Sequence, residues 1–201
     1  ARLFILSDSP PEKDVQWSEE GIAASFKFIQ KLWNLNIKIN NEIEKKHSKD
    51  TSNNLTKYTH KFIKKITDNL NDFNYNVIIA NLHEAYNYIN KEITNEYKSH
   101  TLKENYKRIL IALIPVIPHF SNECLEMLRE NKNVNWPTYD KKLLEEKNTD
   151  IVVQVNGKKR GLINTKKDTD EKELFELISK DKNIYKYLEN KEIKKNIYIK
   201  D

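Results

Sequence analysis

Residues 151–161 read IVVQVNGKKRG, and this stretch decides how the chain is divided. A β-branched run leads into Asn156-Gly157, a pair that tolerates the positive φ values of a two-residue type I′ turn. We therefore predict a β-hairpin over about 151–165. Three cations follow the turn directly and are expected at its tip or just past it: Lys158, Lys159 and Arg160.

Upstream of the hairpin, apolar residues recur at the spacing of amphipathic helices. Ser18 is a typical N-cap residue, with Glu19 and Glu20 in the first turn, where the helix dipole favours them. We predict helices over about 18–40, 55–70, 74–97, 101–114 and 120–128, with a polar loop at 40–54. The predicted buried stripe of the first is Ile22, Phe26, Ile29 and Trp33. Pro115 and Pro118 are expected to break the fourth.

Downstream of the hairpin, the pattern predicts two short helices and a strand. Asp170 is expected to cap a helix that carries Leu174 and Leu177, and a second helix is expected over 183–188. The final strand is expected to contain Ile193, Ile197 and Ile199, with Lys194 and Lys195 beside the hairpin. The order β-β-α-α-β is typical of a small α+β domain, and we expect its sheet to gain one more strand after Asp201.

These elements predict a mainly α protein, an antiparallel helical bundle followed by a small α+β domain. The expected boundaries are a bundle at 1–135, a linker at 136–150 containing Trp136-Pro137, and the small domain at 151–201. Because the chain begins at Ala1, inside the apolar run Leu3 to Leu6, we expect it to be a fragment of a longer protein.

Composition limits the function classes. The single Cys124 excludes an internal disulfide framework and indicates a reducing, cytoplasmic environment. No apolar run approaches the length of a membrane span, and no signal peptide is visible.

Catalytic patterns are absent from the sequence. Its three glycines form no phosphate-binding loop, and its five histidines form no metal-binding pair. His83 and Glu84 are adjacent on a predicted helix and therefore do not face each other. Cys124 has a core-like spacing with Phe120 and Leu128, which favours a buried hydrophobe over a nucleophile. We expect no catalytic, cofactor-binding or metal-binding residue here.

Positive charge is concentrated after residue 150. Residues 151–201 hold 13 Lys and Arg against 9 Asp and Glu, whereas the whole chain carries a net charge of only +5. This asymmetry indicates either a polyanion partner or a lysine-rich solvated surface. The predicted nucleic-acid-binding residues are Asn156, Lys158, Lys159, Arg160, Lys194 and Lys195. For the helix face Lys57, Lys61 and Lys64 a solvated surface is favoured, and for Trp17 and Trp33 packing rather than base stacking.

Several segments resemble the bacterial-type leucyl-tRNA synthetase family, in the same order. Residues 1–33, ARLFILSDSPPEKDVQWSEEGIAASFKFIQKLW, are similar to the entry into its helical anticodon-binding domain. DFNYNVIIANLHEAYNY (72–88) is similar to a helix of that domain, and Ile117-Pro118-His119 with Trp136-Pro137 to its end. IVVQVNGKKRG and KYLENKEIKKNIYIK (186–200) resemble the C-terminal domain and favour the leucyl type over the valyl, isoleucyl and methionyl relatives.

The resemblance implies a tRNA-binding portion of an enzyme that joins leucine to its tRNA using ATP. It implies that the bundle lies along the inner corner of the tRNA and that the small domain reaches the elbow and the long variable arm. The implied partners are leucine tRNA and the catalytic body of the same chain. ATP and Mg²⁺ are implied for the parent enzyme, but no cofactor is implied for this fragment. The parent enzyme is expected to be a cytoplasmic monomer without membrane contact. Neither HIGH nor KMSKS occurs. A helical protein-interaction module without an RNA role fits composition and periodicity equally well.

Overall fold

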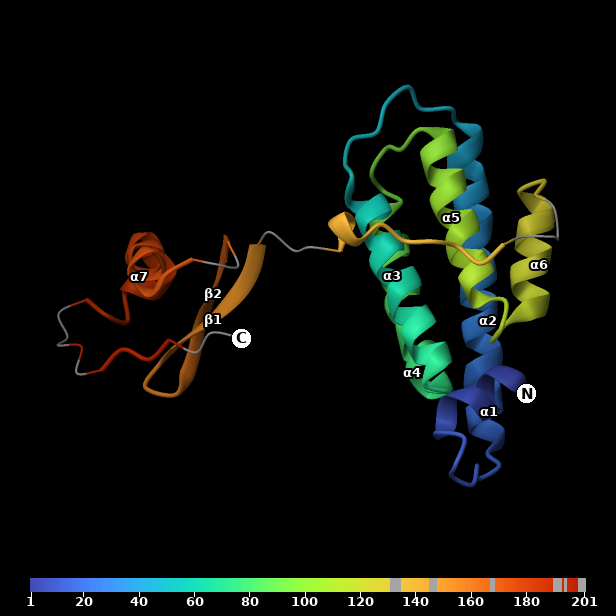
Figure 1. Cartoon of the computed structure of the whole chain (residues 1–201), viewed down its shortest axis with the longest axis horizontal. Helices are drawn as coiled ribbons and strands as arrows, with labels where there is room; N and C mark the ends of the chain where they lie inside the picture. The colour runs from blue at the N-terminus through green and yellow to red at the C-terminus, as the bar shows by residue number, and fades with distance from the viewer. Residues whose placement is uncertain (131–134, 145–147, 167–168, 190–192, 194, 199–201) are drawn as a thin grey trace. The chain divides into compact units, whose positions relative to one another are not determined.

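The computed structural model describes residues 1–130, 135–144, 148–166, 169–189, 193 and 195–198. The chain divides into two compact units, Ala1–Leu144 and Glu145–Asp201, and each has its own hydrophobic core (Figure 1). The first unit contains α1 (Arg2–Asp8), α2 (Glu19–Glu44), α3 (Asn54–Asn71), α4 (Tyr75–Glu92), α5 (Ser99–Leu113), α6 (Pro118–Met127) and the 3₁₀ turn η1 (Lys141–Leu143). The second contains β1 (Asn148–Val155), β2 (Lys158–Lys166), α7 (Glu171–Lys180) and α8 (Lys182–Tyr185).

The four long helices α2 to α5 form an up-and-down bundle. The α2–α3 and α4–α5 connections lie at one end, and the short α3–α4 turn lies at the other (Figure 1). α3 packs against both α4 and α5, and α2 packs against α5. Fully buried isoleucines from three of these helices fill the centre: Ile39, Ile63, Ile66 and Ile78. The predicted fold class, a helical bundle followed by a small α+β unit, is confirmed.

The predicted buried stripe of α2 is wrong at Phe26, whose side chain is 63% exposed. The buried face instead carries Phe28, Leu32, Leu35 and Ile39. Both sets recur at helical spacing, so periodicity alone does not select between them. The helix also continues beyond residue 40 to Glu44, because the burial of Ile39 and the packing of Ile43 on the core hold its last turns.

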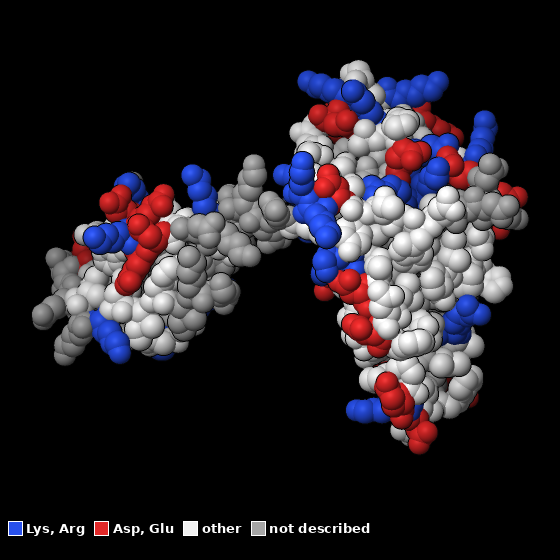
Figure 2. All heavy atoms as spheres, in the orientation of Figure 1, with Lys and Arg blue, Asp and Glu red and all other residues white. Residues whose placement is uncertain are grey.

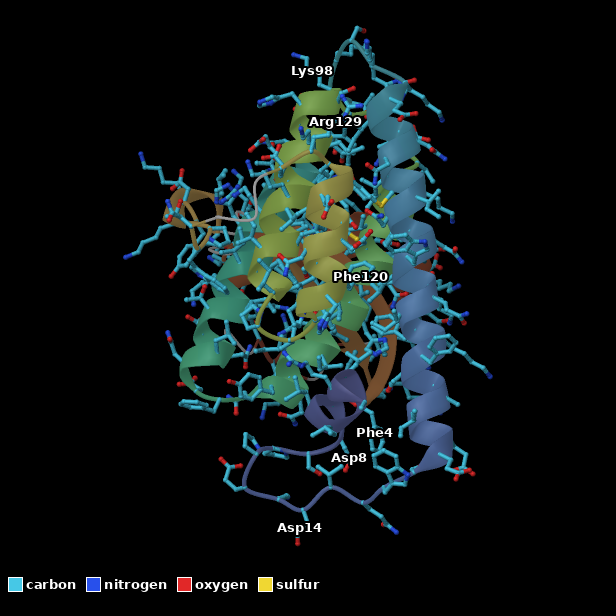
Figure 3. All side chains as sticks on the ribbon, turned by 90° about the vertical axis from the view of Figure 1, so that its right-hand side faces the viewer. Phe4, Asp8, Asp14, Lys98, Phe120 and Arg129 are labelled. Atoms are coloured by element: carbon cyan, nitrogen blue, oxygen red, sulfur yellow. The ribbon has the colours of Figure 1, made fainter. Side chains whose placement is uncertain are left out.

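The first unit begins with α1, a helix that the sequence pattern did not predict. Its Leu3 and Phe4 are buried, and the Phe4 ring lies against the first turn of α2 (Figure 3). A Cβ at Gly21 would come within 2.5 Å of that ring, so the contact requires glycine. Trp17 meets Phe4 edge to face at 6.0 Å but is 66% exposed, so it packs without being a core residue.

The ends of α4, α5 and α6 follow from local chemistry. α4 ends at Glu92, short of the predicted residue 97, because Tyr97 folds back and its buried hydroxyl donates to the Glu92 carboxylate. The predicted break at the prolines is confirmed, since α5 ends at Leu113 and Pro118 occupies the first turn of α6. α6 packs mainly against α5, and its Phe120 also meets Trp33 of α2 edge to face.

Residues 135–144, which include part of the predicted linker, pack on α3 and α5. The Trp136 indole Nε1 donates to Thr67 Oγ1 at 3.0 Å, and Pro137 is buried. The backbone N–H of Asp140 donates to His60 Nδ1 at 2.8 Å. These contacts place this segment in the first unit rather than between the units.

The second unit is a hairpin covered by two short helices. The predicted cap of α7 is confirmed, since Asp170 accepts a hydrogen bond from the Glu173 N–H at 2.8 Å. The core residues come from both strands and both helices: Val153, Ile163, Leu174 and Ile184. The predicted final strand is wrong for its described residues, because 193 and 195–198 have no regular secondary structure and the described sheet has two strands.

Charges of both signs are mixed on the surface of the helical unit. Figure 2 shows Lys and Arg interleaved with Asp and Glu toward one end of this unit, beside a broad area without charge. Among the described ion pairs, Lys107 and Lys103 bind Glu130 at 2.8 and 3.0 Å. In the described part of the chain, no helix has the length and apolar character needed to cross a membrane.

Candidate nucleic-acid interface

The hairpin turn has the predicted geometry. Asn156 has φ 52° and Gly157 has φ 72°, and the flanking Val155 and Lys158 are cross-strand partners. Positive φ at both central residues defines the type I′ turn, whose twist matches that of the strands. Both turn residues are exposed. The prediction of a two-residue turn at Asn156-Gly157 is confirmed.

β2 contains a β-bulge directly after the turn. Gln154 is opposite Lys159, but Val153 is opposite Gly161, so Arg160 is an extra residue without a partner of its own on β1. A bulge redirects the side chains at its position. Strand alternation would put Arg160 on the face opposite to Lys159 and Gly161; the bulge allows Arg160 and Gly161 to share one face.

The two faces of the hairpin have different surroundings. Val153 and Ile163 are buried against the helices, whereas Val152 and Leu162 are 46% and 50% exposed. Because cross-strand partners share a face, Lys158 lies on the helix-covered side with Val155, and Lys159 lies on the open side with Gln154. We call these the covered side and the open side. The three predicted cations are therefore divided between them.

Arg160 is held by an aromatic ring on the covered side. Its guanidinium carbon lies 4.1 Å from the centre of the Tyr187 ring, a cation–π distance. Its Nε is buried and has no hydrogen-bond partner among the described residues. Lys186 Nζ lies 5.2 Å from the same ring centre. The signal that sequence reasoning overlooked is the KY pair at 186–187, an aromatic residue beside a lysine in the basic unit.

Gly161 sets the distance between β2 and α8. A Cβ at this position would come within 2.5 Å of Ile184 Cδ1, and Ile184 is only 1% exposed. The missing side chain lets α8 approach the strand closely. Tyr187 follows α8 directly, so this approach helps to bring its ring to Arg160.

The predicted cations at the C-terminal end are only partly described. Lys194 lies outside the described residues. Lys195 is exposed, in a segment without regular secondary structure, so it does not extend the sheet beside the hairpin. Tyr198 anchors this segment, since its hydroxyl donates to the Thr169 carbonyl at 3.3 Å.

The hairpin cations lack carboxylate partners within the described part of the chain. The ion pair that the structure describes in the second unit joins Lys180 to Glu176 at 3.7 Å. Lys158 and Lys159 are exposed, and Arg160 is half-buried against Tyr187. Such cations remain available to an anionic ligand.

Other charged and reactive residues of the helical unit have structural partners. His83 stacks on Phe28 at 3.7 Å, while Glu84 binds Lys65 at 3.3 Å, so the two neighbours do not act on each other. Burial lowers the pKa of His83, and the nearby Lys31 lowers it further.

Cys124 is fully buried, as predicted, and burial raises the pKa of its thiol to about 12. At neutral pH this thiol is therefore protonated and a poor nucleophile. On the lysine face of α3, Lys64 binds Asp68 one turn away, whereas Lys57 is exposed.

Comparison with known proteins shows similarity over both units. Leucine–tRNA ligase of Orientia tsutsugamushi is 38% identical over 206 residues, which cover 99% of this chain and 24% of that protein. Leucine–tRNA ligase of Fusobacterium nucleatum is 35% identical over 214 residues, covering 98% of this chain and 25% of that protein. The chain thus spans about a quarter of the length of the curated relatives it matches.

A solved structure has the same fold. It is a ternary complex of LeuRS from Agrobacterium radiobacter K84 with tRNA and LeuAMS, with a TM-score of 0.74 and 18% identity, covering 98% of this chain and 26% of that one. The family model described as "Anticodon-binding domain of tRNA ligase" matches residues 52–175, from the start of α3 through the hairpin into α7. Since this match includes more than half of the chain, the chain belongs to the family of anticodon-binding domains of tRNA ligases.

Proposed function

We propose that this chain is the tRNA-binding portion of a leucine–tRNA ligase and that it positions leucine tRNA for ATP-dependent aminoacylation. The observation that carries the proposal is the alignment with leucine–tRNA ligases along 98–99% of the chain, at 35–38% identity. Valyl-, isoleucyl- or methionyl-type ligases share the helical family but are not needed to explain this alignment.

The proposal assigns catalysis to the remainder of a longer parent protein. Leucine, ATP and Mg²⁺ would bind there, and the present chain would act together with that catalytic body as a monomer in the cytoplasm. The hairpin supports a binding role for the second unit. Its cations are free of carboxylate partners in the described residues, and cations on rigid elements neutralise phosphates with little ordering cost.

In this proposal, Lys158, Lys159 and Arg160 contact the tRNA backbone, and Asn156 with Gly157 shapes the turn that presents them. Lys194 and Lys195 contribute from the C-terminal segment. Recognition would depend on RNA shape and backbone, because the deep major groove of A-form RNA hides the base edges from side chains.

The test is fluorescence anisotropy of the whole chain with labelled leucine tRNA at several salt concentrations. The competitor is the same tRNA with its long variable arm shortened. We expect salt-sensitive binding, and weaker competition by the short-armed tRNA. Equal competition by both RNAs would reduce the proposal to a generic RNA-binding surface. Absence of binding at low salt would favour a protein-interaction module instead.

A further inference from the structure

We propose that the second unit binds the backbone of double-helical RNA on the covered side of its hairpin, through Arg160, Lys158 and Lys186, with Tyr187 as the residue that positions Arg160. This inference rests on the proposed tRNA-binding function and specifies the side, the residues and the RNA form. Lys186 and Tyr187 are new to the site, and Lys159 lies on the other side of the hairpin.

Arg160 lies on the covered side of the hairpin, in contact with Tyr187. Arg160 follows Lys159 and alternates to the opposite side, where Tyr187 lies, as the 4.1 Å cation–π contact shows. The bulge brings Gly161, the partner of Val153, to the same side. Val153 is buried on the covered side, and Val155 lies two residues further along the strand, so it is on the same side. Lys158 is the cross-strand partner of Val155 and therefore also lies on the covered side. Three cations from β2 and the segment after α8 therefore share one side of the unit.

The position of Arg160 suits a phosphate ligand. The Tyr187 ring covers one face of the Arg160 guanidinium. The N–H groups of the guanidinium lie in its plane, so the ring does not block them. The buried Nε has no hydrogen-bond partner among the described residues, and a buried donor without a partner is unfavourable. A phosphate oxygen at this edge would accept from Nε and a neighbouring N–H together, as arginine forks commonly arrange.

Lys186 adds a second positive charge at the same ring. Arg160 and Lys186 both lie within about 6 Å of the Tyr187 ring centre, the usual cation–π limit. Two cations near one ring repel each other unless an anion lies close to both. No described carboxylate pairs with either of them. A phosphate at this position would relieve the repulsion.

The open side has the opposite character. Its exposed residues include Val152 and Leu162, and Lys159 is its cation near the turn. Apolar side chains gain nothing from contact with phosphates, so the surface of the covered side fits an RNA backbone better.

The contacts of the Tyr187 ring with Arg160 and Lys186 favour double-helical RNA over a single strand as the ligand. Single strands are usually bound by stacking exposed bases on aromatic rings. In this unit the Tyr187 ring is already in contact with two cations, so it supports a phosphate contact rather than a base. Paired RNA presents its phosphates outside and its bases inside.

The experiment measures anisotropy of the whole chain with leucine tRNA over a salt series. The variants are Lys158→Gln, Arg160→Gln and Lys186→Gln, and the matched control is Lys166→Gln, the same charge change at an exposed position at the far end of β2. We expect each of the first three to lower the slope of log K against log salt by about 0.7 to 0.9, and the control to leave it unchanged. Circular dichroism verifies that each variant is folded.

Tyr187 is tested by a conservative pair. Tyr187→Phe retains the ring and should bind as the unaltered chain does. Tyr187→Leu removes the ring but no charge, and should weaken binding several-fold, as expected for a positioning residue. Equal weakening by both would overturn this role.

Three further outcomes distinguish failure of this inference from failure of the proposed tRNA-binding function. If Lys166→Gln lowers the slope as much as Lys158→Gln does, RNA binding stands and the localised surface on the covered side is wrong. If single-stranded oligouridine competes as well as a duplex RNA of equal length, the double-helical preference is wrong. If the unaltered chain does not bind leucine tRNA at low salt, the proposed function itself fails.

Discussion

His60 on α3 is contacted from both sides by hydrogen-bond donors. The Asp140 N–H approaches Nδ1 at 2.8 Å, and Arg108 Nη1 lies 3.0 Å from Nε2. A neutral imidazole accepts on one nitrogen only, and a protonated imidazole accepts on neither. Burial lowers the pKa of His60, the charge of Arg108 lowers it further, and Asp140 raises it in part. The neutral ring is therefore the form that holds residues 136–140 on the helices.

The first prediction is a pH-dependent loosening of this segment. Since the folded pKa of His60 is below its usual 6.5, its contribution to stability is complete above pH 6.5 and is lost as pH falls through the folded pKa. Fluorescence of Trp136, in a Trp17→Phe/Trp33→Phe background, should change between pH 8 and 5. His60→Gln should abolish the change, and an unaltered titration in that variant would exclude His60 as the cause.

The contact between β2 and α8 shows how one small residue fixes the relation between two elements. Gly161 lies against Ile184. The turn at Asn156-Gly157 and the bulge together set the directions of the side chains of residues 158–160. α7 contributes Leu174 to the same core. Each of these elements is short, so their mutual packing, rather than intrinsic propensity, holds them.

The second prediction concerns this packing. Gly161→Ala should destabilise the second unit by about 1–3 kcal/mol, because the added methyl group overpacks the site against Ile184. Ile184→Ala removes both atoms that the new methyl group would meet, Cδ1 at 2.5 Å and Cγ1 at 2.6 Å. In a double-mutant cycle, measured by urea unfolding of the second unit, the two changes should therefore offset each other. Strict additivity would contradict the proposed contact.

At the scale of the whole molecule, the two cores differ greatly in size. The core of the helical unit draws buried residues from α1 to α6, whereas the buried core residues described in the second unit are Val153, Ile163, Leu174 and Ile184. Small domains bury less of their surface and are correspondingly less stable. The binding side proposed for the hairpin thus belongs to the less stable unit.

The third prediction is that the units respond separately to a core substitution. Leu174→Ala should destabilise the second unit by about 2–5 kcal/mol, the usual range for removing a buried leucine side chain. Hydrogen exchange measured by mass spectrometry should show loss of protection in peptides from 148–189. All three tryptophans lie in the first unit, so the tryptophan fluorescence transition should not shift. A matching shift would show that the units unfold together.

Local chemistry made several features predictable. Asn156-Gly157 accepts positive φ, Asp170 and Ser18 cap helices with side-chain oxygens, and the prolines after α5 cannot continue a helix. The helical periods also identified the bundle. In each case the cause lies within a few residues of its effect, so the sequence was sufficient.

The candidate site was predictable only in part, because its arrangement depends on long-range packing. The sequence indicated that Lys158, Lys159 and Arg160 follow the turn, but not that a bulge puts Gly161 on the same side as Arg160. Tyr187 meets Arg160 only because α8 returns to β2 at Gly161.

By itself, the sequence determined the two-part organisation, the turn, the capped helices and the cation-rich second unit. The tertiary structure alone decided that Phe26 is exposed and Phe28 buried, that the apolar start of the chain forms α1, and that Arg160 lies on Tyr187. The reason is physical. Backbone preferences and capping act between neighbours, whereas the buried face of a helix and the partner of a cation depend on which distant elements pack against them.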